Sequence, residues 1–551
     1  MPFPPFTPTV PVFLRHVAER SGDDVLIVLG ARRLSYAEAE RESAELARGL
    51  VALGATKGSR IGILLPNGPD FVLAWLAATR IGAVAVPINT FYRARELHYV
   101  LRHADVQILL TADEILGGDC LERLEAAAPS LRQARGEPLF LPELPHLRAV
   151  RVFGATGRPF AGEGPSGLPA LARARGVGPE LLAEIEQEVH PADPMVIIYS
   201  SGSTAEPKGA IHSHGAVIRH TFNLNTLRDL RREDVIYSPM PFFWVGGLTF
   251  SLVGAMHAGA RLICEERFEP GRTLELLERE RVTVVAAWPH FAKAMTEHPS
   301  FGERDLSSVR TGTLHAALPE SRRPRDPELR HNSLGMTETC GPHTWGDPEI
   351  ELPERLRGSF GRGVPGLEHR IVDPETGETL PPGTSGEICV RGYSLMQGLV
   401  KREREETFDV DGFYHTGDRG RFDEEGHLFF EGRLGEMIKT GGANVAPREV
   451  ELRLEALPEV RSAFVVGIPD PDRGEVVAAA VLPAGNAAPD PEALRRRLRE
   501  ELAAYKVPRH LLLFREEELP FTDSGKIDKR RLVGVIGERL ASRAAPAGSR
   551  V

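Results

Sequence analysis

Between residues 60 and 87 the chain alternates strand and helix, and this pattern restricts its fold more than any other feature. The apolar run 60–65 reads as a buried strand, residues 69–80 as a helix, and 83–87 as a second buried strand. The same order returns at 193–225 and 258–290. Strands separated by a helix pair in parallel, because the helix carries the chain back along the sheet. The sequence therefore predicts βαβ units and an α/β fold.

The sequence pattern changes twice after this alternating region. From about residue 358, short strands punctuated by Gly, Pro and Asp indicate a smaller, mainly β lobe. After residue 433 a compact α+β segment follows. We expect a large N-terminal domain over 1–433, with its β lobe at about 358–433, and a small, mobile C-terminal domain over 434–551.

Two helix boundaries can be predicted from end signals. Ser35 and Glu38 have the spacing of a capping box, so a helix should begin after Ser35. Asp490 followed by Pro491 should begin the last clear helix, which we expect to run to Lys506.

Composition excludes several functional classes. The 551 residues are 42% hydrophobic and 26% charged, which is ordinary for a globular protein. The net charge of −10 argues against a nucleic-acid-binding protein, because such proteins present basic surfaces. The four cysteines have no CxxC spacing, so neither a zinc site nor a disulfide framework is expected. The Pro-rich start is a poor signal peptide, and no apolar run reaches the ~20 residues that span a bilayer; we expect a cytoplasmic protein.

The segment Met195-Val-Ile-Ile-Tyr-Ser-Ser-Gly-Ser-Thr-Ala-Glu-Pro-Lys-Gly209 is the most specific in the chain. A buried strand leads into a loop of hydroxyl and Gly residues that ends in a Lys. Small residues allow backbone N–H groups to approach an anion, and the Lys adds a point charge. The Lys-Gly ending does not fit a Walker A loop. A phosphate-holding loop is the favoured interpretation, and a flexible Ser/Gly turn is the alternative. The predicted phosphate contacts are Ser200, Ser201, Gly202, Ser203, Thr204 and Lys208.

This loop resembles the phosphate-binding signature of the adenylate-forming superfamily, which includes acyl-CoA synthetases, peptide-synthetase adenylation domains and luciferases. Four further blocks follow in the family's order and resemble its other signatures: Asn332-Ser-Leu-Gly-Met-Thr-Glu-Thr339, Tyr414-His-Thr-Gly-Asp418, Gly432-Arg433 with Gly441-Gly-Ala-Asn444, and Pro520-Phe-Thr-Asp-Ser-Gly-Lys526. The resemblance covers residues 35 to 532 and is strongest to fatty-acid–CoA ligases.

The resemblance implies an ATP-dependent reaction in which a carboxylate attacks the α-phosphorus and expels pyrophosphate. Lys526 and Glu338, together with Thr204 and Lys208, are the implied catalytic residues, and Glu338 is the implied Mg²⁺ ligand. Asp418 is implied to bind the ribose hydroxyls, and Arg433 is implied to contact the ribose or the phosphate. Taken alone, these residues have simpler interpretations: a solvated Lys, a surface Glu, a turn-forming Asp and a surface Arg.

Further sites follow from the same blocks. The implied adenine site is formed by His315, Ala316, Ala317, Leu334, Gly335, Met336 and Thr337, with Leu334 where the family has an aromatic ring. Gly441 and Gly442 are implied to line the tunnel for coenzyme A, and Gly435 is the implied hinge. Trp244 and Gly246 are implied to lie at the acyl pocket, although a core aromatic is an equal interpretation of Trp244.

The leading hypothesis is therefore an acid–CoA ligase for a medium- or long-chain fatty acid, with ATP, Mg²⁺ and CoA as its cofactors and co-substrates. The alternatives are a ligase for an aryl or steroid-like acid, an enzyme that loads a carrier protein, and an inactive nucleotide- or acyl-CoA-binding protein. The expected partners are small molecules, without nucleic acid or a transmembrane segment; a homodimer is compatible with the sequence.

Overall fold

The computed structural model describes residues 3–200, 206–323, 326, 329–330, 332–347, 350–434, 438–445, 447–485, 488–520 and 527–544. The chain divides into two compact units. The larger comprises residues 1–90, 97–199 and 209–434, and the smaller comprises 91–96, 200–208 and 435–551. The α/β fold class, with a large N-terminal part and a smaller C-terminal part, is confirmed.

An eight-stranded sheet forms one layer of the fold, in the order β22-β11-β10-β4-β3-β5-β8-β9. Strands β3, β4, β5 and β8 pair in parallel, as the alternating sequence pattern predicts. The strands are β3 (Arg60–Leu64), β4 (Val84–Pro87), β5 (Ile108–Ala112), β8 (Ala149–Phe153), β9 (Ala161–Glu163), β10 (Pro194–Ser200), β11 (Lys208–Ser213) and β22 (Gly398–Leu399).

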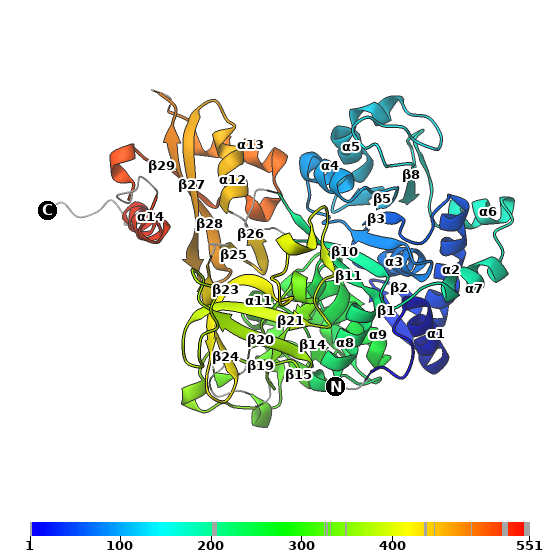
Figure 1. The fold of residues 1–551 in the computed structure, drawn as a ribbon, viewed down its shortest axis with the longest axis horizontal. Coiled ribbons are helices and arrows are strands. Elements are labelled where there is room, and N and C mark those ends of the chain that lie inside the picture. The colour runs from blue at the N-terminus through cyan, green and yellow to red at the C-terminus, as the bar shows by residue number, and fades with distance from the viewer. Residues whose placement is uncertain are drawn as a thin grey trace. The chain divides into compact units, whose positions relative to one another are not determined.

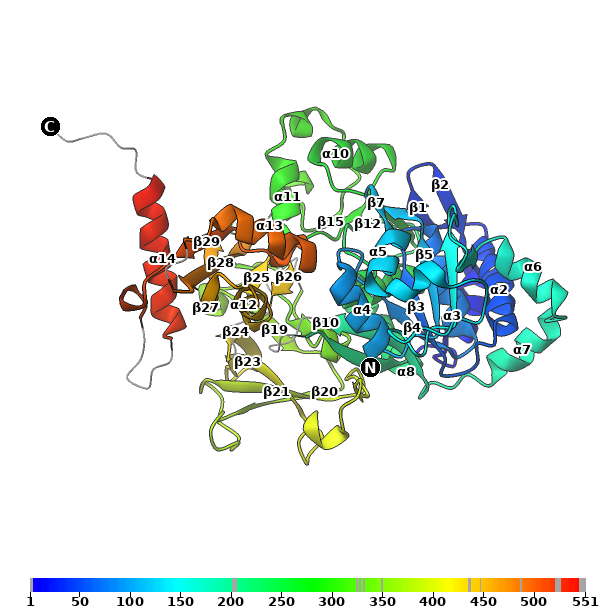
Figure 2. The ribbon, with the colours of Figure 1, turned by 90° about the horizontal axis from the view of Figure 1, so that it is seen from above.

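The helix of the predicted unit is α3 (Pro69–Arg80), in which every residue except Asp70 is buried. It packs beside β3 and β4 (Figure 1). Helix α2 (Tyr36–Ala52) begins after Ser35 with the predicted capping box, in which each side chain satisfies a backbone N–H of the other residue. The short helices α6 (Gly167–Ala174) and α7 (Pro179–Gln187) lie against α2 (Figure 2). The remaining helices here are α1 (Val10–Ser21), α4 (Ala94–His103) and α5 (Cys120–Ala127).

A second sheet has six strands in the order β15-β14-β12-β13-β1-β2, all parallel except β2. They are β1 (Val25–Leu29), β2 (Arg32–Ser35), β12 (Val235–Tyr237), β13 (Arg261–Cys264), β14 (Val284–Val285) and β15 (Thr311–Gly312). The associated helices are α8 (His214–Arg228), the π-helix η2 (Gly246–Val253), α9 (Gly254–Ala258), α10 (Pro270–Arg279) and α11 (Pro289–Thr296). Apolar side chains of α10 and α11 close a core over this sheet.

The β lobe is an antiparallel sheet in the order β18-β19-β24-β23-β21-β20. It begins at residue 344, earlier than the sequence suggested, because β18 pairs with β19. The strands are β18 (Thr344–Trp345), β19 (Ser359–Gly363), β20 (Leu367–Val372), β21 (Gly386–Gly392), β23 (Tyr414–Phe422) and β24 (His427–Arg433).

The smaller unit contains a five-stranded sheet in which β28 is flanked by β25, β27 and β29. Its elements are β25 (Ile438–Thr440), β26 (Ala443–Val445), α12 (Pro447–Glu455), β27 (Val460–Asp470), β28 (Gly474–Pro483), α13 (Pro491–Glu501), β29 (His510–Leu513) and α14 (Lys529–Ala544).

The predicted helix from Asp490 to Lys506 is correct at its start and wrong at its end. Asp490 caps α13 by accepting a hydrogen bond from the backbone of Glu492. The helix ends at Glu501 because Leu502 is extended and fully buried. It is also not the last helix, since α14 follows.

Among the described residues, no helix has the length and apolarity required to cross a membrane.

Candidate active site

The predicted metal-binding carboxylate lies in a short, tightly bonded turn. Strands β16 (Gly335–Met336) and β17 (Gly341–Pro342) pair antiparallel around a 3₁₀ turn over Thr337–Thr339, and we call residues 335–342 the Glu338 turn. The Thr339 hydroxyl accepts a hydrogen bond from the Met336 N–H at 3.3 Å and donates one to the Gly341 carbonyl at 2.7 Å. The turn is therefore fixed by its own side chain as well as by its backbone.

Two buried histidines hold the same turn from outside. His212 Nε2 lies 2.8 Å from the Thr337 carbonyl, and His220 Nε2 lies 2.9 Å from the Pro342 carbonyl. Burial lowers the pKa of both imidazoles to about 4, so both are neutral at pH 7. A carbonyl only accepts hydrogen bonds, so in each ring Nε2 carries the proton and donates it.

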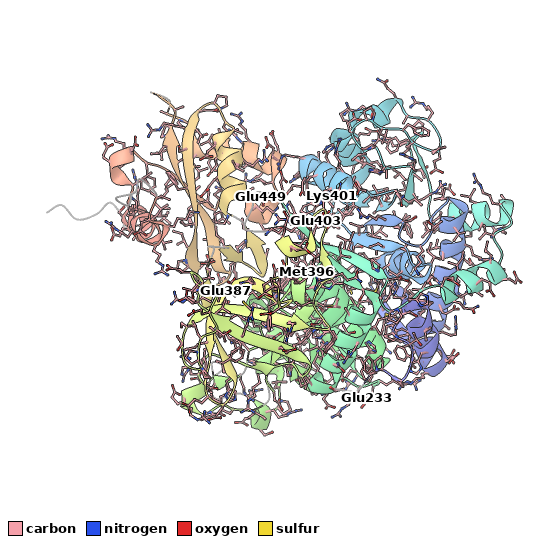
Figure 3. All side chains as sticks on the ribbon, in the orientation of Figure 1. Glu233, Glu387, Met396, Lys401, Glu403 and Glu449 are labelled. Atoms are coloured by element: carbon pink, nitrogen blue, oxygen red, sulfur yellow. The ribbon has the colours of Figure 1, made fainter. Side chains whose placement is uncertain are left out.

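A backbone contact completes this support. The N–H of Met396, a residue labelled in Figure 3, donates to the Glu338 carbonyl at 2.9 Å. The sequence interpretation missed His212, His220 and Met396. The available signal was the occurrence of His at 212 and 220 within an apolar strand–helix segment directly after the phosphate loop.

The predicted acyl-pocket residues Trp244 and Gly246 lie at the start of η2. The Leu248 N–H donates to the Trp244 carbonyl at 2.9 Å, and the Thr249 hydroxyl lies 3.3 Å from the Cys340 carbonyl. This contact brings η2 against the Glu338 turn. π-Helices are uncommon and occur often at functional sites.

The loop before η2 is held by a side-chain amide and by a close backbone approach. Asn67 donates to the Met240 carbonyl and accepts from the Phe242 N–H, both at 2.8 Å. A Cβ at Gly247 would lie 2.0 Å from the Pro241 carbonyl oxygen, so this position requires glycine. Asn67 and Gly247 are further positioning residues that the sequence did not reveal.

Trp244 belongs to a chain of aromatic rings, which we call the aromatic cluster. Its members are Phe243, Trp244, Phe268, Trp288 and Phe291. Trp244 lies edge-on to Trp288, with 5.9 Å between ring centroids, and Trp288 stacks on Phe291 at 5.7 Å. These three rings are only partly buried, which leaves apolar surface next to η2.

The predicted ribose ligand Asp418 lies on β23 and is 3% exposed. Its N–H donates to the Thr416 hydroxyl at 3.0 Å, and that hydroxyl donates to the Ile388 carbonyl at 2.7 Å. Arg433 is the backbone partner of Asp418 on β24. These two residues, which the resemblance assigns to the nucleotide, are thus adjacent in the sheet.

The predicted adenine-binding residues occupy two places in the larger unit. Residues His315–Ala317 form a 3₁₀ turn shortly after β15, and burial with the nearby Arg330 lowers the pKa of His315. Leu334 is 6% exposed and packs into the core of the β lobe with residues such as Ile388 and Val390. Its side chain therefore contributes to the β-lobe core.

Several predicted residues lie outside the described part of the chain. These are Ser201, Gly202, Ser203 and Thr204 in the phosphate loop, Gly435 and Lys526. The flanking positions are described: Ser200 ends β10 and Lys208 begins β11.

In the smaller unit, Gly441 and Gly442 form the two-residue turn between β25 and β26, with φ values of 56° and 82°. Both central positions of such a hairpin turn need positive φ, which explains the Gly-Gly pair.

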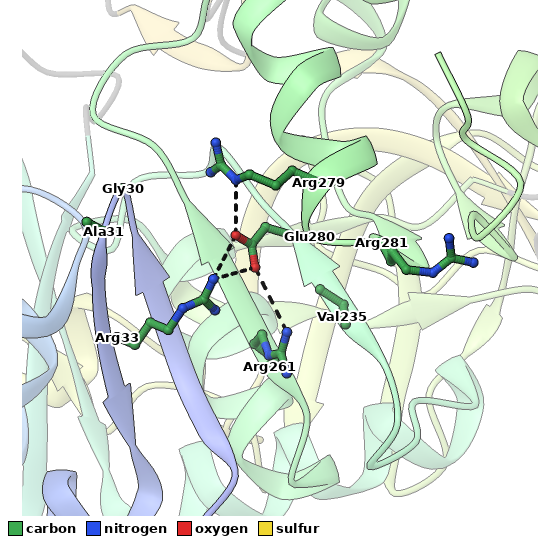
Figure 4. A pocket seen from close by; sticks show the side chains of 8 residues that line it. All are labelled: Gly30, Ala31, Arg33, Val235, Arg261, Arg279, Glu280 and Arg281. Carbon is green, nitrogen blue, oxygen red and sulfur yellow. Dashed lines mark hydrogen bonds and ion pairs between the residues drawn. The ribbon is translucent and has the colours of Figure 1, made fainter.

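One pocket of the larger unit contains none of the predicted site residues. Arg33, Arg261 and Arg279 surround the buried carboxylate of Glu280 in this pocket, whereas Arg281 lines the pocket and points away from Glu280 (Figure 4). Arg33 holds both oxygens of Glu280, at 2.9 and 3.0 Å, and so ties β2 to the end of α10. We interpret this charge cluster as a structural link.

The Glu338 turn suits a hard divalent cation by its chemistry. Mg²⁺ prefers oxygen ligands, and Glu338 offers a carboxylate that is 9% exposed on a backbone fixed at three carbonyls. The fixed backbone limits the positions from which the Glu338 carboxylate would hold Mg²⁺.

Comparison with known proteins agrees with the class of enzyme that this fold and these blocks define. Residues 14–400 match the family described as AMP-binding enzyme, and residues 449–526 match the AMP-binding enzyme C-terminal domain. The chain is 30% identical to the putative acyl-CoA synthetase YngI of Bacillus subtilis, covering 95% of this chain and 96% of the relative. It is 32% identical to a feruloyl-CoA synthase of an Amycolatopsis species, covering 91% and 93%. The structure of the amide bond synthetase McbA from Marinactinospora thermotolerans superposes with a TM-score of 0.76 at 28% identity, covering 95% and 99%.

The chain therefore belongs to the AMP-binding enzyme family, and the expected adenylate-forming superfamily is confirmed. The expected enzyme class, an AMP-forming acid–CoA ligase, is also confirmed by these relatives. Enzymes of this kind use ATP, CoA and Mg²⁺.

Proposed function

We propose that this ligase activates a carboxylic acid with an apolar acyl group, in the first place a medium- or long-chain fatty acid. The observation that carries the proposal is the partly buried aromatic cluster at the start of η2. Helix η2 itself contacts the Glu338 turn, through the Thr249 hydroxyl and the Cys340 carbonyl. Apolar surface next to the carboxylate-bearing turn suits an acyl chain whose carboxyl group must reach the phosphate.

Aryl acids are the second candidate. Trp244 and Trp288 meet at an interplanar angle of 62°, an edge-to-face arrangement into which a third ring can pack. The feruloyl-CoA synthase among the relatives acts on an acid with an aromatic ring.

The proposed division of roles follows the chain's own residues. Glu338, whose backbone is held by the Met396 N–H and whose neighbour Thr337 is held by His212, would hold Mg²⁺, which would supply positive charge to the phosphate oxygens when bound. Asp418 accepts hydrogen bonds from the ribose hydroxyls, and Lys208 with the hydroxyls of the phosphate loop binds the phosphates.

Lys526 contributes the charge that pairs with the acid's carboxylate during adenylation. Gly435 serves as the hinge that moves this lysine away before CoA enters through the Gly441–Gly442 turn. These two assignments, and the division of the chain into domains at residue 433, rest on the resemblance.

The substrate proposal is tested with acids of graded length and ring content. Acid-dependent pyrophosphate release and thioester formation are measured with ATP and CoA present. We expect kcat/KM to rise with aliphatic chain length. A maximum for ring-containing acids would favour the aryl candidate, and a preference for short polar acids would contradict both candidates.

A variant links this preference to the aromatic cluster. Trp244→Ala removes about 1.5–3 kcal/mol of apolar contact, which corresponds to a rise in KM of roughly 10- to 150-fold for apolar acids. Replacing Phe140, which is 76% exposed, by Ala is the matched control. An unchanged KM in Trp244→Ala would remove the cluster from the acyl site.

The role of Lys526 is tested by separating the two half-reactions. In Lys526→Ala we expect acyl-adenylate formation to fall by about 10²- to 10³-fold, while supplied acyl-adenylate is still converted to thioester. An equal loss of both half-reactions would contradict the assignment.

A further inference from the structure

Three metal-ligating side chains meet on one side of the β lobe, and we call Glu387, Cys389 and His415 the β21–β23 cluster. Glu387 and Cys389 lie two residues apart on β21, so they tend to the same face of the sheet. His415 is the direct cross-strand partner of Cys389 on β23. An irregularity in the pairing between Glu387 and Cys389 brings the carboxylate to the same imidazole.

The distances in this cluster are close to those of a metal site. His415 Nδ1 lies 2.8 Å from Glu387 Oε2 and 3.5 Å from Cys389 Sγ, and the three ligand atoms all lie within 4.8 Å of one another. With Zn–S near 2.3 Å and Zn–N and Zn–O near 2.0–2.1 Å, a tetrahedral site needs an S···N edge of about 3.6 Å and an N···O edge of about 3.4 Å. The S···N edge is already present. The N···O edge needs to open by about half an ångström, as a hydrogen bond gives way to two metal bonds.

The carboxylate of Asp409, on the far side of the His415 ring, also suits a metal site. Asp409 Oδ2 lies 3.5 Å from His415 Nε2, the ring nitrogen that faces away from Cys389 and Glu387. Metal-binding histidines commonly donate their other ring N–H to a carboxylate, which orients the ring and raises its basicity. Asp409 is itself held by backbone N–H groups of Asp411 and Phe413 at 3.0 and 2.8 Å.

The local charge favours a cation. The carboxylates of Glu387 and Asp409 flank the His415 imidazole, and Asp409 also pairs with Arg370. The fixed charges of these two carboxylates and this guanidinium sum to about −1 before any metal enters.

We propose that Glu387, Cys389 and His415 form a binding site for Zn²⁺ or a similar thiophilic divalent cation, with water as the fourth ligand and Asp409 orienting His415. On binding, the Cys389 thiol loses its proton to solvent and a metal–sulfur bond forms. The site is reached from the side of His415, whose side chain is 40% exposed, whereas Cys389 is buried. Its sulfur ligand distinguishes it from the all-oxygen Mg²⁺ site proposed at Glu338.

The location of this site ties it to the Thr416–Asp418 segment. Glu387 uses its other oxygen, Oε1, to accept a hydrogen bond from the Gly417 N–H at 2.9 Å. A metal held by Oε2 would therefore cross-link β21 and β23 directly beside Asp418. Glu387 is labelled in Figure 3.

The test is a Co²⁺ titration of the chelator-treated full chain. Co²⁺ takes the same tetrahedral ligands as Zn²⁺, and a bound thiolate gives a near-ultraviolet charge-transfer band together with intense visible bands. We expect one equivalent to produce both, Zn²⁺ to abolish them and excess Mg²⁺ to leave them unchanged. Absence of the charge-transfer band at excess Co²⁺, or its removal by Mg²⁺, would overturn the proposal.

Variants assign the ligands. Cys389→Ser should abolish the charge-transfer band, while Cys120→Ser, another buried cysteine, should retain it. Because a core substitution at Cys389 can impair folding, His415→Gln on the exposed side provides a second variant, whose Co²⁺ affinity should fall at least tenfold. Asp409→Asn should weaken binding by about 10- to 100-fold. A band that persists in Cys389→Ser, or an unchanged affinity in a folded His415→Gln, would refute the assignment.

Discussion

Mild acid should unfold the larger unit, because several of its histidines are buried in the neutral form. Burial lowers the pKa of five imidazoles from 6.5 to about 3 or 4; they are His212, His214, His220, His257 and His369. His214 illustrates the physical reason: its Nδ1 accepts a hydrogen bond from the Val10 N–H at 3.2 Å, so protonation at Nδ1 would set two donors against each other.

The sign and size of the effect follow from proton linkage. The pKa of each ring is lower in the folded protein, so between pH 6.5 and 4 the unfolded chain binds protons that the folded chain does not. The stabilisation is therefore complete above pH 6.5 and is lost as the pH falls. At pH 5 each of these imidazoles lowers the unfolding free energy by about 2 kcal/mol relative to neutral pH, so five lower it by about 10 kcal/mol. Glu137 and Glu265, whose pKa values burial raises, act in the opposite direction, but they are two groups against five. A loss of this size is comparable to the whole stability of a typical domain.

Urea unfolding followed by tryptophan fluorescence measures this loss of stability in the larger unit of the protein. The chain has four tryptophans, and all of them lie in the larger unit: Trp75, Trp244, Trp288 and Trp345. We expect the unfolding free energy to fall steeply between pH 6.5 and 5, with a slope equivalent to about four or five protons.

Two variants test the origin of the slope. His257→Phe should reduce it by about one proton, because the ring lies among Phe6, Phe13 and Phe222, where a phenyl group fits. His146→Gln, at a side chain that is 55% exposed, should leave the slope unchanged. A stability that is constant from pH 7 to 5 would refute the reasoning.

Two further substitutions test the packing that positions the site. Arg80→Met should lower the unfolding free energy measured in urea by about 3–5 kcal/mol. Arg80 and Glu186 form a buried ion pair at 2.6 Å, so Glu186 would lose its buried partner. If adding Glu186→Leu fails to restore stability, this cause is contradicted. Gly247→Ala should lower the unfolding free energy by about 1–3 kcal/mol and raise the KM for the acid, because its Cβ would lie 2.0 Å from the Pro241 carbonyl oxygen. Gly302→Ala is the control: its Cβ would meet open space, so neither quantity should change.

The sequence alone determined the class of fold and the family. Local patterns carried this information: the alternation at 60–87 predicted α3 and its parallel strands, and the capping box predicted the start of α2. Such signals depend on residues within one or two turns of each other, so a single sequence contains them in full. The helix end at Glu501 was mispredicted, because Leu502 leaves the helix to enter the core, which is a tertiary effect.

Only the tertiary structure decided which distant side chains meet. The histidines that fix the Glu338 turn are more than a hundred residues away from it, and no periodicity links them to it. The cysteine spacing led us to expect no zinc site, yet Cys389 faces His415 across two adjacent strands with Glu387 beside it. Cross-strand register and its irregularities are set by packing over the whole sheet, and therefore the composition of such clusters cannot be obtained from spacing along the chain.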